Sequence, residues 1–329
     1  MRNLCKRKSL FFFFVLLLVL TLIFCSFCGC NDFNTVKTNS DAAEKKLNVV
    51  ATLFPQYDFA RQILKDKANV TLLLPPGTES HMYDPTPNDI SKIYSSDVFL
   101  YTGKDMEPWS EKIISGIKNN GFKILNISDG IDLKKEKHNH KESTQQKKKE
   151  HHNHRYDPHV WLDPSIALNI VENILKVLCK EDPENKEFFE ENAKFLKDEI
   201  KNLERDFEDL VASSKKKIVF VGNFAHLYFV DRFNLEYETA FDGCSQGSEP
   251  SVKKISKIIN FIKENEIGAV YYDGSVPNKV AESIANQTGV KLLRFSSCHN
   301  FTKEQINKVN EVTYIKIMRE NLENLKVGL

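Results

Sequence analysis

The sequence lacks an excess of charge of either sign. Its 46 lysines and arginines are matched by 45 aspartates and glutamates, which leaves a formal net charge of +1. Proteins that bind nucleic acid usually present strongly basic surfaces, so we expect no nucleic-acid partner. The sequence also has no His-Glu-x-x-His segment, the helical motif of one large class of zinc hydrolases. Hydrophobic residues still make up 41% of the 329, which is enough for a folded protein of two domains.

A long apolar run occurs only at the N-terminus, where the basic segment Met1–Lys8 precedes Leu10–Phe24. A membrane span needs about 20 apolar residues, so this shorter run is more typical of an export signal. The following "IFCSFCGC" is similar to the end of a bacterial lipoprotein signal, with Gly29 before the expected lipid-bearing Cys30. We therefore expect a signal peptide at 1–29 and a folded part outside the cytoplasm, anchored to the cell membrane. An uncleaved anchor helix is the open alternative.

Cysteine is scarce beyond this segment, where only Cys179, Cys244 and Cys298 remain of the seven. At most one disulfide can form among these three. Outside the cytoplasm, Cys244 and Cys298 are the pair that we expect. Isolated buried thiols are the alternative that the sequence leaves open.

Strand-like and helix-like patterns alternate along both halves of the chain. A polar tether at 30–46 precedes an N-terminal lobe at 47–182, and a C-terminal lobe covers 215–329. Such alternation is typical of βαβ units, so we predict an α/β fold with a mostly parallel sheet flanked by helices in each lobe. The strand-like runs are LNVVATL (47–53), ANVTLLL (68–74), DVFLYTG (97–103), FKILNIS (122–128), KKIVFVGN (216–223), LEYETAF (235–241), IGAVYYDG (267–274) and VKLLRFSS (290–297).

Residues 183–214 form one long helical pattern without glycine between the lobes. Apolar residues recur there at roughly helical spacing, which predicts a rigid helix that joins the two lobes. Two lobes create a cleft, and ligands of α/β folds bind at the carboxyl ends of strands. The residues that we assign to the apolar stripe are Phe188, Phe195, Ile200, Leu203, Phe207 and Leu210.

Two histidines lie in loops stiffened by proline. His81 follows the second strand-like run, in TESHMYDPTPNDI (78–90), and His159 lies in YDPHVWLDP (156–164). A metal-bound imidazole usually donates its other N–H to a carboxylate, and Asp157 and Asp163 are near candidates along the chain. A single loop histidine is more often an ordinary surface residue, so each motif by itself is a weak indication.

Together these segments resemble the metal-binding lipoproteins of bacterial ABC importers for zinc and manganese, over nearly the whole chain beyond the signal. DPHVWLDP is the most specific segment, and HMYDPTPNDI, GSEPSVKKI and TYIKIMRENLENLKVGL are similar to other parts of the family. The resemblance implies two α/β lobes bridged by one long helix, with the metal in the cleft between them. It also implies a solute-binding protein, not an enzyme, that passes its metal to an ABC permease. We expect it to act as a monomer.

The resemblance further implies that zinc-handling members carry a histidine-rich loop just before the second histidine motif. Residues 136–155 fit this description, so we expect an auxiliary metal loop there, with His81 and His159 in the site proper. Neutral imidazoles suit zinc, whereas manganese favours oxygen ligands, so Zn²⁺ is the expected transported ligand rather than Mn²⁺. The histidines of the auxiliary loop are His138, His140, His151, His152 and His154.

The sequence departs from the family pattern at the third and fourth ligand positions, which fall on Asn223 and Ser296. Zinc usually takes at least three good protein ligands, so another residue must complete the site. His226 is one candidate, one helical turn beyond Asn223, although a core histidine is the more ordinary interpretation. His299 is another, three residues past Ser296, although it could be a plain surface residue. A histidine of the auxiliary loop is the third candidate.

Two other classes of function stay open from the sequence alone. A surface interaction protein, such as an adhesin, with a degenerate metal site would also explain Asn223 and Ser296. A zinc hydrolase would need a general base beside a metal-bound water, and acidic residues near His159 could serve in principle.

Overall fold

The structure, a computed structural model, describes residues 46–117, 122–135, 156–241, 243, 250–274, 279–302, 305, 308 and 311–329. The expected signal peptide, the tether up to residue 45, the auxiliary loop and Cys244 lie outside the described residues. Within the described part of the chain, no helix combines the length and the apolar character needed to cross a membrane.

Four parallel strands form the first sheet, in the order β2-β1-β3-β4. All four runs predicted in this half form strands, namely β1 (Leu47–Ala51), β2 (Ala68–Leu72), β3 (Val98–Tyr101) and β4 (Lys123–Asn126). The helices that connect them are α2 (Phe54–Leu64), α3 (Pro87–Ser95) and α4 (Ser110–Gly116). Proline near the start of α2 and α3 suits the first helical turn, where no N–H is needed.

The second sheet repeats this arrangement with the order β6-β5-β7-β8, again parallel. Its strands are β5 (Lys217–Phe220), β6 (Glu236–Thr239), β7 (Ala269–Tyr272) and β8 (Lys291–Arg294). The helices beside it are α7 (Leu227–Arg232), α8 (Val252–Glu264) and α9 (Lys279–Thr288). The predicted fold class, two parallel sheets flanked by helices, is confirmed.

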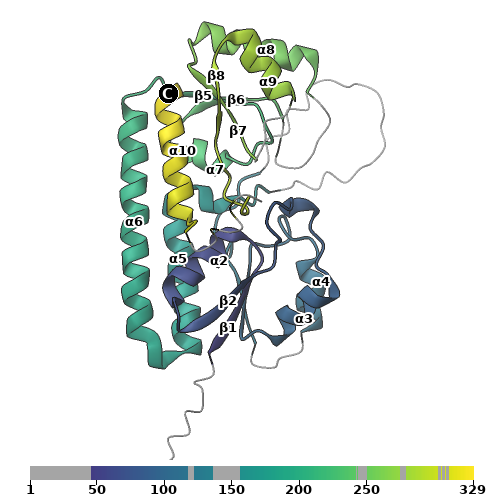
Figure 1. Cartoon of the computed structure of the whole chain (residues 1–329), viewed down its shortest axis with the longest axis vertical. Coiled ribbons are helices and arrows are strands. Elements are labelled where there is room, and N and C mark those ends of the chain that lie inside the picture. The colour runs from purple at the N-terminus through teal and green to yellow at the C-terminus, as the bar shows by residue number, and fades with distance from the viewer. Residues whose placement is uncertain are drawn as a thin grey trace, which may run out of the picture. The chain divides into compact units, whose positions relative to one another are not determined.

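Three long helices lie beside the two sheets, and α6 runs alongside α5 and α10 in Figure 1. They are α5 (Pro164–Glu181), α6 (Lys186–Ala212) and α10 (Tyr314–Gly328). The predicted linking helix is therefore confirmed, entered through the 3-10 turn η3 (Pro183–Asn185). This helix does not stand alone between the lobes, because α2, α5 and α10 all pack against it.

The predicted apolar stripe of α6 was wrong at Phe195, which is 67% exposed. The buried residues follow a regular spacing of three and four positions, and residue 195 falls between two of them, on the outer side. Phe188 and Leu210, also assigned to the stripe, are half-buried at its edges. The fully covered residues are Phe189, Ala193, Leu196, Ile200, Leu203, Phe207 and Val211.

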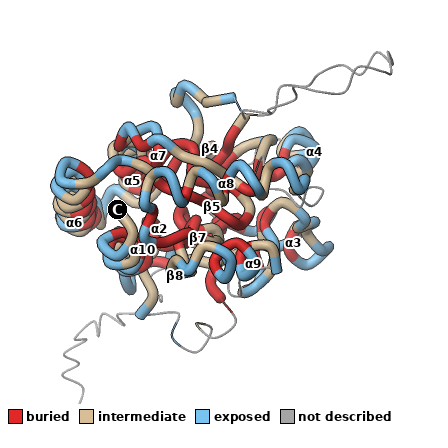
Figure 2. Tube along the Cα trace, turned by 90° about the horizontal axis from the view of Figure 1, so that it is seen from above, coloured by how far each residue is buried: buried red, intermediate tan, exposed pale blue. Residues whose placement is uncertain are grey.

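One hydrophobic core reaches from the first sheet to the second. Side chains of a strand alternate between the two faces of its sheet. In the first sheet, Val49 and Ala51 join the large core with α2, α5 and α6, while Val50 packs with Ile93 of α3 on the other face. In the second sheet, Phe220 joins the same large core. Figure 2 shows these buried segments between the exposed outer faces of the helices.

Candidate metal centre

Three histidines from distant parts of the chain meet at one place. His81, His159 and His299 each offer one ring nitrogen, and these atoms all lie within 4.8 Å of one another. The ring centroids are 5.5 Å apart for His81 and His159, and 5.6 Å apart for His81 and His299. The third pair, His159 and His299, is closer, with centroids 4.5 Å apart. Three imidazoles at this spacing are a candidate site for a divalent metal.

His81 lies in the short 3-10 helix η1 (Ser80–Met82), a few residues after β2. The Glu79 side chain caps this turn by accepting a hydrogen bond from the backbone N of His81 at 3.3 Å. Before it, Gly77 has φ of 75°, a left-handed conformation that glycine adopts at little cost. The Gly77 N–H donates to the carbonyl of Phe301 at 2.8 Å. The His81 turn is thus tied directly to the segment that carries His299.

His159 is fully buried, just before the 3-10 turn η2 (Val160–Leu162). Its Nδ1 lies 2.7 Å from Asp157 Oδ1, and the same oxygen accepts a hydrogen bond from the backbone N of His159 at 2.9 Å. The expectation of a nearby carboxylate partner is therefore met by Asp157. Asp163 has another task, because its side chain caps α5 by accepting from Ser165 N at 2.8 Å.

His299 follows β8, in a loop that neighbouring elements hold in place. Its carbonyl accepts a hydrogen bond from Phe54 N, the first residue of α2, at 3.1 Å. Two residues earlier, the Ser297 carbonyl accepts from Trp161 Nε1 at 2.8 Å. Cys298 between them has φ of 60°, a conformation that side-chain-bearing residues rarely adopt without such support. These contacts with α2 and with Trp161 therefore hold the loop in place.

The distances between the three ring nitrogens can be compared with the distances between ligand atoms in a tetrahedral zinc site. Zinc–nitrogen bonds of about 2.0–2.1 Å in a tetrahedron place ligand atoms roughly 3.3 Å apart. His159 Nε2 and His299 Nε2 are 2.5 Å apart, while all pairs stay within 4.8 Å. Displacements of about 1 Å therefore suffice to bring three imidazoles to coordination distance.

Burial keeps the His159 and His299 imidazoles neutral. Desolvation lowers the pKa of His159 and of His299 to about 3. A neutral imidazole has the free lone pair that a metal requires. Burial also raises the pKa of the Asp157 carboxyl to about 7. The two ring systems are thus ready to bind a cation at neutral pH.

Asp273, directly after β7, supplies negative charge next to these rings. Burial by itself would raise its pKa, but interactions with His226 and His299 and hydrogen bonds from Ser297 bring the pKa below its usual value. Its Oδ2 lies 4.0 Å from His299 Nδ1. The sequence analysis missed this residue, and the only signal was its position at the carboxyl end of a parallel strand.

The other sequence candidates do not join the three-histidine group. His226 and Asn223 do not lie one helical turn apart as predicted, because α7 begins at Leu227 and both residues precede it. The His226 ring is buried and stacks on Phe220, with centroids 4.6 Å apart. Ser296 uses its hydroxyl to accept from Cys298 N, and its backbone bonds twice to Asn321 of α10.

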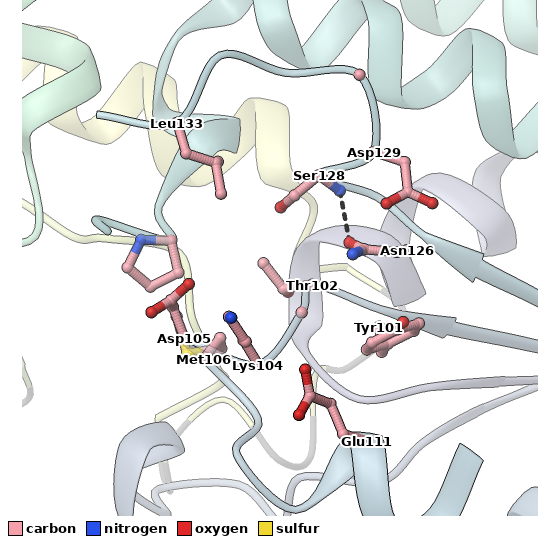
Figure 3. A pocket seen from close by; sticks show the side chains of 13 residues that line it. Tyr101, Thr102, Lys104, Asp105, Met106, Glu111, Asn126, Ser128, Asp129 and Leu133 are labelled. Atoms are coloured by element: carbon pink, nitrogen blue, oxygen red, sulfur yellow. Dashed lines mark hydrogen bonds between the residues drawn. The ribbon is translucent and has the colours of Figure 1, made fainter. Parts of the chain in front are cut away.

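A pocket of about 330 Å³ lies beside the site, at the carboxyl ends of β3 and β4 (Figure 3). Pro158, the neighbour of His159, lines it, but none of the three histidines does. Its charged groups are the side chains of Lys104, Asp105, Glu111 and Asp129. The pocket and the three-histidine group are therefore separate sites.

Comparison with known proteins assigns the family. Residues 49–328 match the family described as the zinc-uptake complex component A, a periplasmic protein. The chain belongs to this family. The high-affinity zinc uptake system protein ZnuA of Bacillus subtilis is 33% identical over 313 residues, 95% of this chain and 97% of the relative. The predicted kinship to zinc-type solute-binding proteins of ABC importers is confirmed, and zinc is the ligand associated with the family.

Solved structures of the family have the same fold. The metal-dependent lipoprotein YcdH from Bacillus subtilis is 32% identical with a TM-score of 0.73, covering 86% of this chain and 99% of that one. The Zn(II)-bound ZnuA-like domain of Streptococcus pneumoniae AdcA is 29% identical with a TM-score of 0.69, covering 85% of this chain and 98% of that one. The fold that surrounds the three histidines is thus one in which zinc has been observed.

Proposed function

We propose that this protein captures Zn²⁺ outside the cytoplasm with His81, His159 and His299, and delivers it to an ABC permease. The observation that carries the proposal is the convergence of three ring nitrogens within 4.8 Å, from segments far apart in the sequence. Membership of the zinc-uptake family supports zinc as the ion that this cluster binds.

The site binds by coordination and performs no chemical conversion in this proposal. Three imidazoles supply three ligands, and water is the natural fourth ligand of a tetrahedral zinc ion. Asp157 and Asp273 balance the charge of the ion without occupying a coordination position. A set of nitrogen ligands also disfavours Mn²⁺, which prefers oxygen.

The auxiliary loop at 136–155 is proposed to collect zinc and pass it to the site. The loop leaves and rejoins the described chain at Lys135 and Tyr156, which form an antiparallel bridge. Tyr156 is three residues from His159 along the chain, and the bridge places Lys135 beside Tyr156, so both ends of the loop lie near the site. This position favours an accessory role over a place in the site itself.

Calorimetric titration of the purified full-length protein with Zn²⁺ and with Mn²⁺ tests the proposal. We expect one tight zinc site in the wild type and much weaker binding of manganese. Double replacement His81→Ala/His159→Ala should abolish the tight site, while deletion of 137–154 should leave it intact. Loss of tight binding on deletion of the loop alone would show that the assignment of site and loop is wrong.

The same titration separates the other functions that the sequence left open. An adhesin with a degenerate site would show only weak zinc binding that depends on the loop. A zinc hydrolase would bind zinc tightly and also turn over a panel of ester and peptide substrates. Tight, reversible binding without turnover is the result that supports a transport role.

Attachment to the membrane through a lipid on Cys30 is part of the proposal. Mass spectrometry of the protein isolated from membranes should find Cys30 as the modified first residue. Cys30→Ala should release the protein from the membrane fraction or leave its signal peptide uncleaved. An unmodified Cys30 in membrane-bound protein would instead favour the uncleaved anchor helix.

A further inference from the structure

The pocket at the carboxyl ends of β3 and β4 has no part in the proposed zinc site, because none of the three histidines lines it. Its volume of about 330 Å³ lies at the lower end of the range for small-molecule sites, about 300–1,000 Å³. The carboxyl ends of parallel strands are also where α/β folds usually bind their ligands. The size and the place of this pocket therefore both suit a small solute.

The two turns that form the pocket are held in place by hydrogen bonds of their own. After β3, the buried Glu107 carboxylate accepts from Thr102 N at 3.1 Å and from Gly103 N at 2.9 Å. After β4, Asn126 Oδ1 accepts from Ser128 N at 2.9 Å, the bond drawn in Figure 3. These bonds give the walls of the pocket a defined arrangement, which a selective binding site needs.

Glycine at position 103 leaves room between the two turns. Its φ of 129° is a conformation that residues with side chains rarely adopt. A Cβ at this position would lie 3.3 Å from Asn126 Nδ2 and 3.5 Å from Asn126 Oδ1. Any larger residue at 103 would therefore press on an amide that lines the pocket.

The charged side chains of the lining are available to a ligand. Three carboxylates, those of Asp105, Glu111 and Asp129, and the single ammonium group of Lys104 give the lining a formal charge of −2 (Figure 3). Within the described part of the chain, none of these four side chains forms an ion pair or a hydrogen bond. Asp105 is half-buried and the other three are exposed, so a solute can reach all of them from the solvent.

The spacing of these groups favours an organic cation over a metal ion. Among the described residues, the three histidines of the metal centre are the only group of three or more metal-ligating side chains that converge. The three carboxylates of the pocket are therefore too far apart to share one ion as ligands. The net negative charge of the lining disfavours an anion. A cation long enough to reach several of the carboxylates satisfies both conditions.

The rest of the lining indicates the other parts of the ligand. Met106, Leu133 and Pro158 offer apolar surface, which suits an aliphatic chain. Lys104 would repel a simple diamine but would attract a ligand that also carries a carboxylate. Basic amino acids combine two cationic groups, a carboxylate and an aliphatic chain in one small molecule.

We propose that this pocket binds a free basic amino acid, such as lysine or arginine. The carboxylates of Asp105, Glu111 and Asp129 hold its two cationic groups, and Lys104 holds its carboxylate. The chain then has two sites, one for a metal ion and one for an organic solute. This second site does not depend on the proposed zinc function, because the two sites share no side chain.

Equilibrium dialysis of the full-length protein with radiolabelled lysine and arginine tests the proposal. Free amino acids also chelate zinc, so the buffer contains EDTA. We expect one site for at least one of the two amino acids, with a dissociation constant below about 1 mM. Norleucine, which lacks the side-chain ammonium group of lysine, and cadaverine, which lacks its carboxylate, should each bind at least about tenfold more weakly than lysine. Absence of lysine and arginine binding, or equal binding of norleucine or cadaverine, would overturn the proposal.

Matched variants test which side chains hold the amino acid. Glu111→Gln and Asp129→Asn should each weaken lysine binding about 3- to 10-fold, because each removes one charged partner. Asp132→Asn is the control, since Asp132 is exposed in the same loop as Asp129 but does not line the pocket. Lys104→Met should weaken the binding of lysine but not that of cadaverine. Equal effects of Asp129→Asn and Asp132→Asn would overturn the site, and thermal unfolding establishes that each variant is folded.

Two further variants separate this pocket from the metal centre and from the rest of the chain. His81→Ala/His159→Ala should bind lysine as the wild type does, and loss of lysine binding there would place the amino acid at the metal centre instead. Deletion of 137–154 should also leave lysine binding unchanged. Lysine binding that is present only after this deletion would show that lysines of the chain itself fill the pocket, and would overturn the proposal of a free ligand.

Discussion

His299 and His226 were both candidates from the sequence, yet their surroundings differ completely. His299 has one ring nitrogen 2.5 Å from His159 and the other against a serine hydroxyl. The His226 ring lies between aromatic rings, stacked on Phe220 and edge-on to Phe295 with centroids 4.9 Å apart. The first environment suits a metal ligand and the second suits a packing residue.

Replacing each of these histidines by alanine should have opposite consequences. We expect His299→Ala to lower the zinc affinity by at least about 100-fold, because loss of a ligand exceeds loss of a ligand's partner. His226→Ala should leave the affinity within a few-fold and lower the free energy of unfolding by about 2 kcal/mol through the cavity that it creates. Calorimetric titration and denaturant unfolding measure the two effects. A loss of zinc binding in His226→Ala alone would return His226 to the site.

Glu107 is a buried carboxyl that holds the ends of β1 and β3 together. Its oxygens accept hydrogen bonds from Thr52 Oγ1 at 2.5 Å, from Thr102 N at 3.1 Å and from Gly103 N at 2.9 Å. Desolvation nevertheless raises its pKa to about 7. A carboxyl whose folded pKa is above the unfolded value stabilises most at low pH. That contribution is lost as the pH rises through about 7.

Glu107→Gln should remove this part of the pH dependence. The wild type, compared with the variant, should lose about 2 kcal/mol of unfolding free energy between pH 5 and pH 8. Urea unfolding of both proteins at a series of pH values measures the difference, and Glu111→Gln, on the exposed side of α4, is the control for removal of one charge. Parallel pH profiles for wild type and Glu107→Gln would contradict the assignment.

The helix α6 shows how far the periodicity of apolar residues predicts which side chains are buried. Its seven covered side chains lie on the side that packs against other helices, whereas Phe195 is exposed. An apolar residue in a helix is thus a good indication of burial only when its neighbours at three and four positions share the face.

The same substitution at two positions of α6 should therefore cost very different amounts. Phe207 is fully buried against Phe229, with ring centroids 5.1 Å apart, so Phe207→Ala should cost about 3–5 kcal/mol. Phe195→Ala should change the free energy of unfolding by less than about 0.5 kcal/mol. Denaturation midpoints of the two variants measure these changes in stability. Equal losses of unfolding free energy would show that Phe195 is covered in solution.

At the scale of the whole folded part, the two sheets share one core. The start of α10 belongs to the second half of the chain but bonds to the first. Tyr314 N donates to Asp58 Oδ2 at 2.8 Å, and Tyr314 Oη donates to the Trp161 carbonyl at 2.7 Å. The Tyr314 ring also packs edge-on against Phe59 of α2, with centroids 5.0 Å apart. The two halves are therefore joined by much more than the linking helix.

This shared core predicts that the zinc-free protein unfolds in a single cooperative transition. Calorimetry should give a calorimetric enthalpy close to the van't Hoff enthalpy. Zinc at about 1,000 times its dissociation constant should add about 4 kcal/mol and move the whole transition upward without splitting it. Two separate transitions, of which zinc shifts only one, would show that the lobes are independent.

The sequence by itself determined the strands, the long helix and the two proline-bounded histidine motifs, because periodicity, turn residues and short motifs act over a few positions. His81 and His159 were found in this way. The third member of the cluster was decided by the tertiary structure. His299 lies 140 positions from His159, and the helix-face argument for His226 failed because α7 begins one residue later. Only the packing of the loops after β2, β7 and β8 brings His81, Asp273 and His299 together, since distances between separate segments depend on how the whole chain packs.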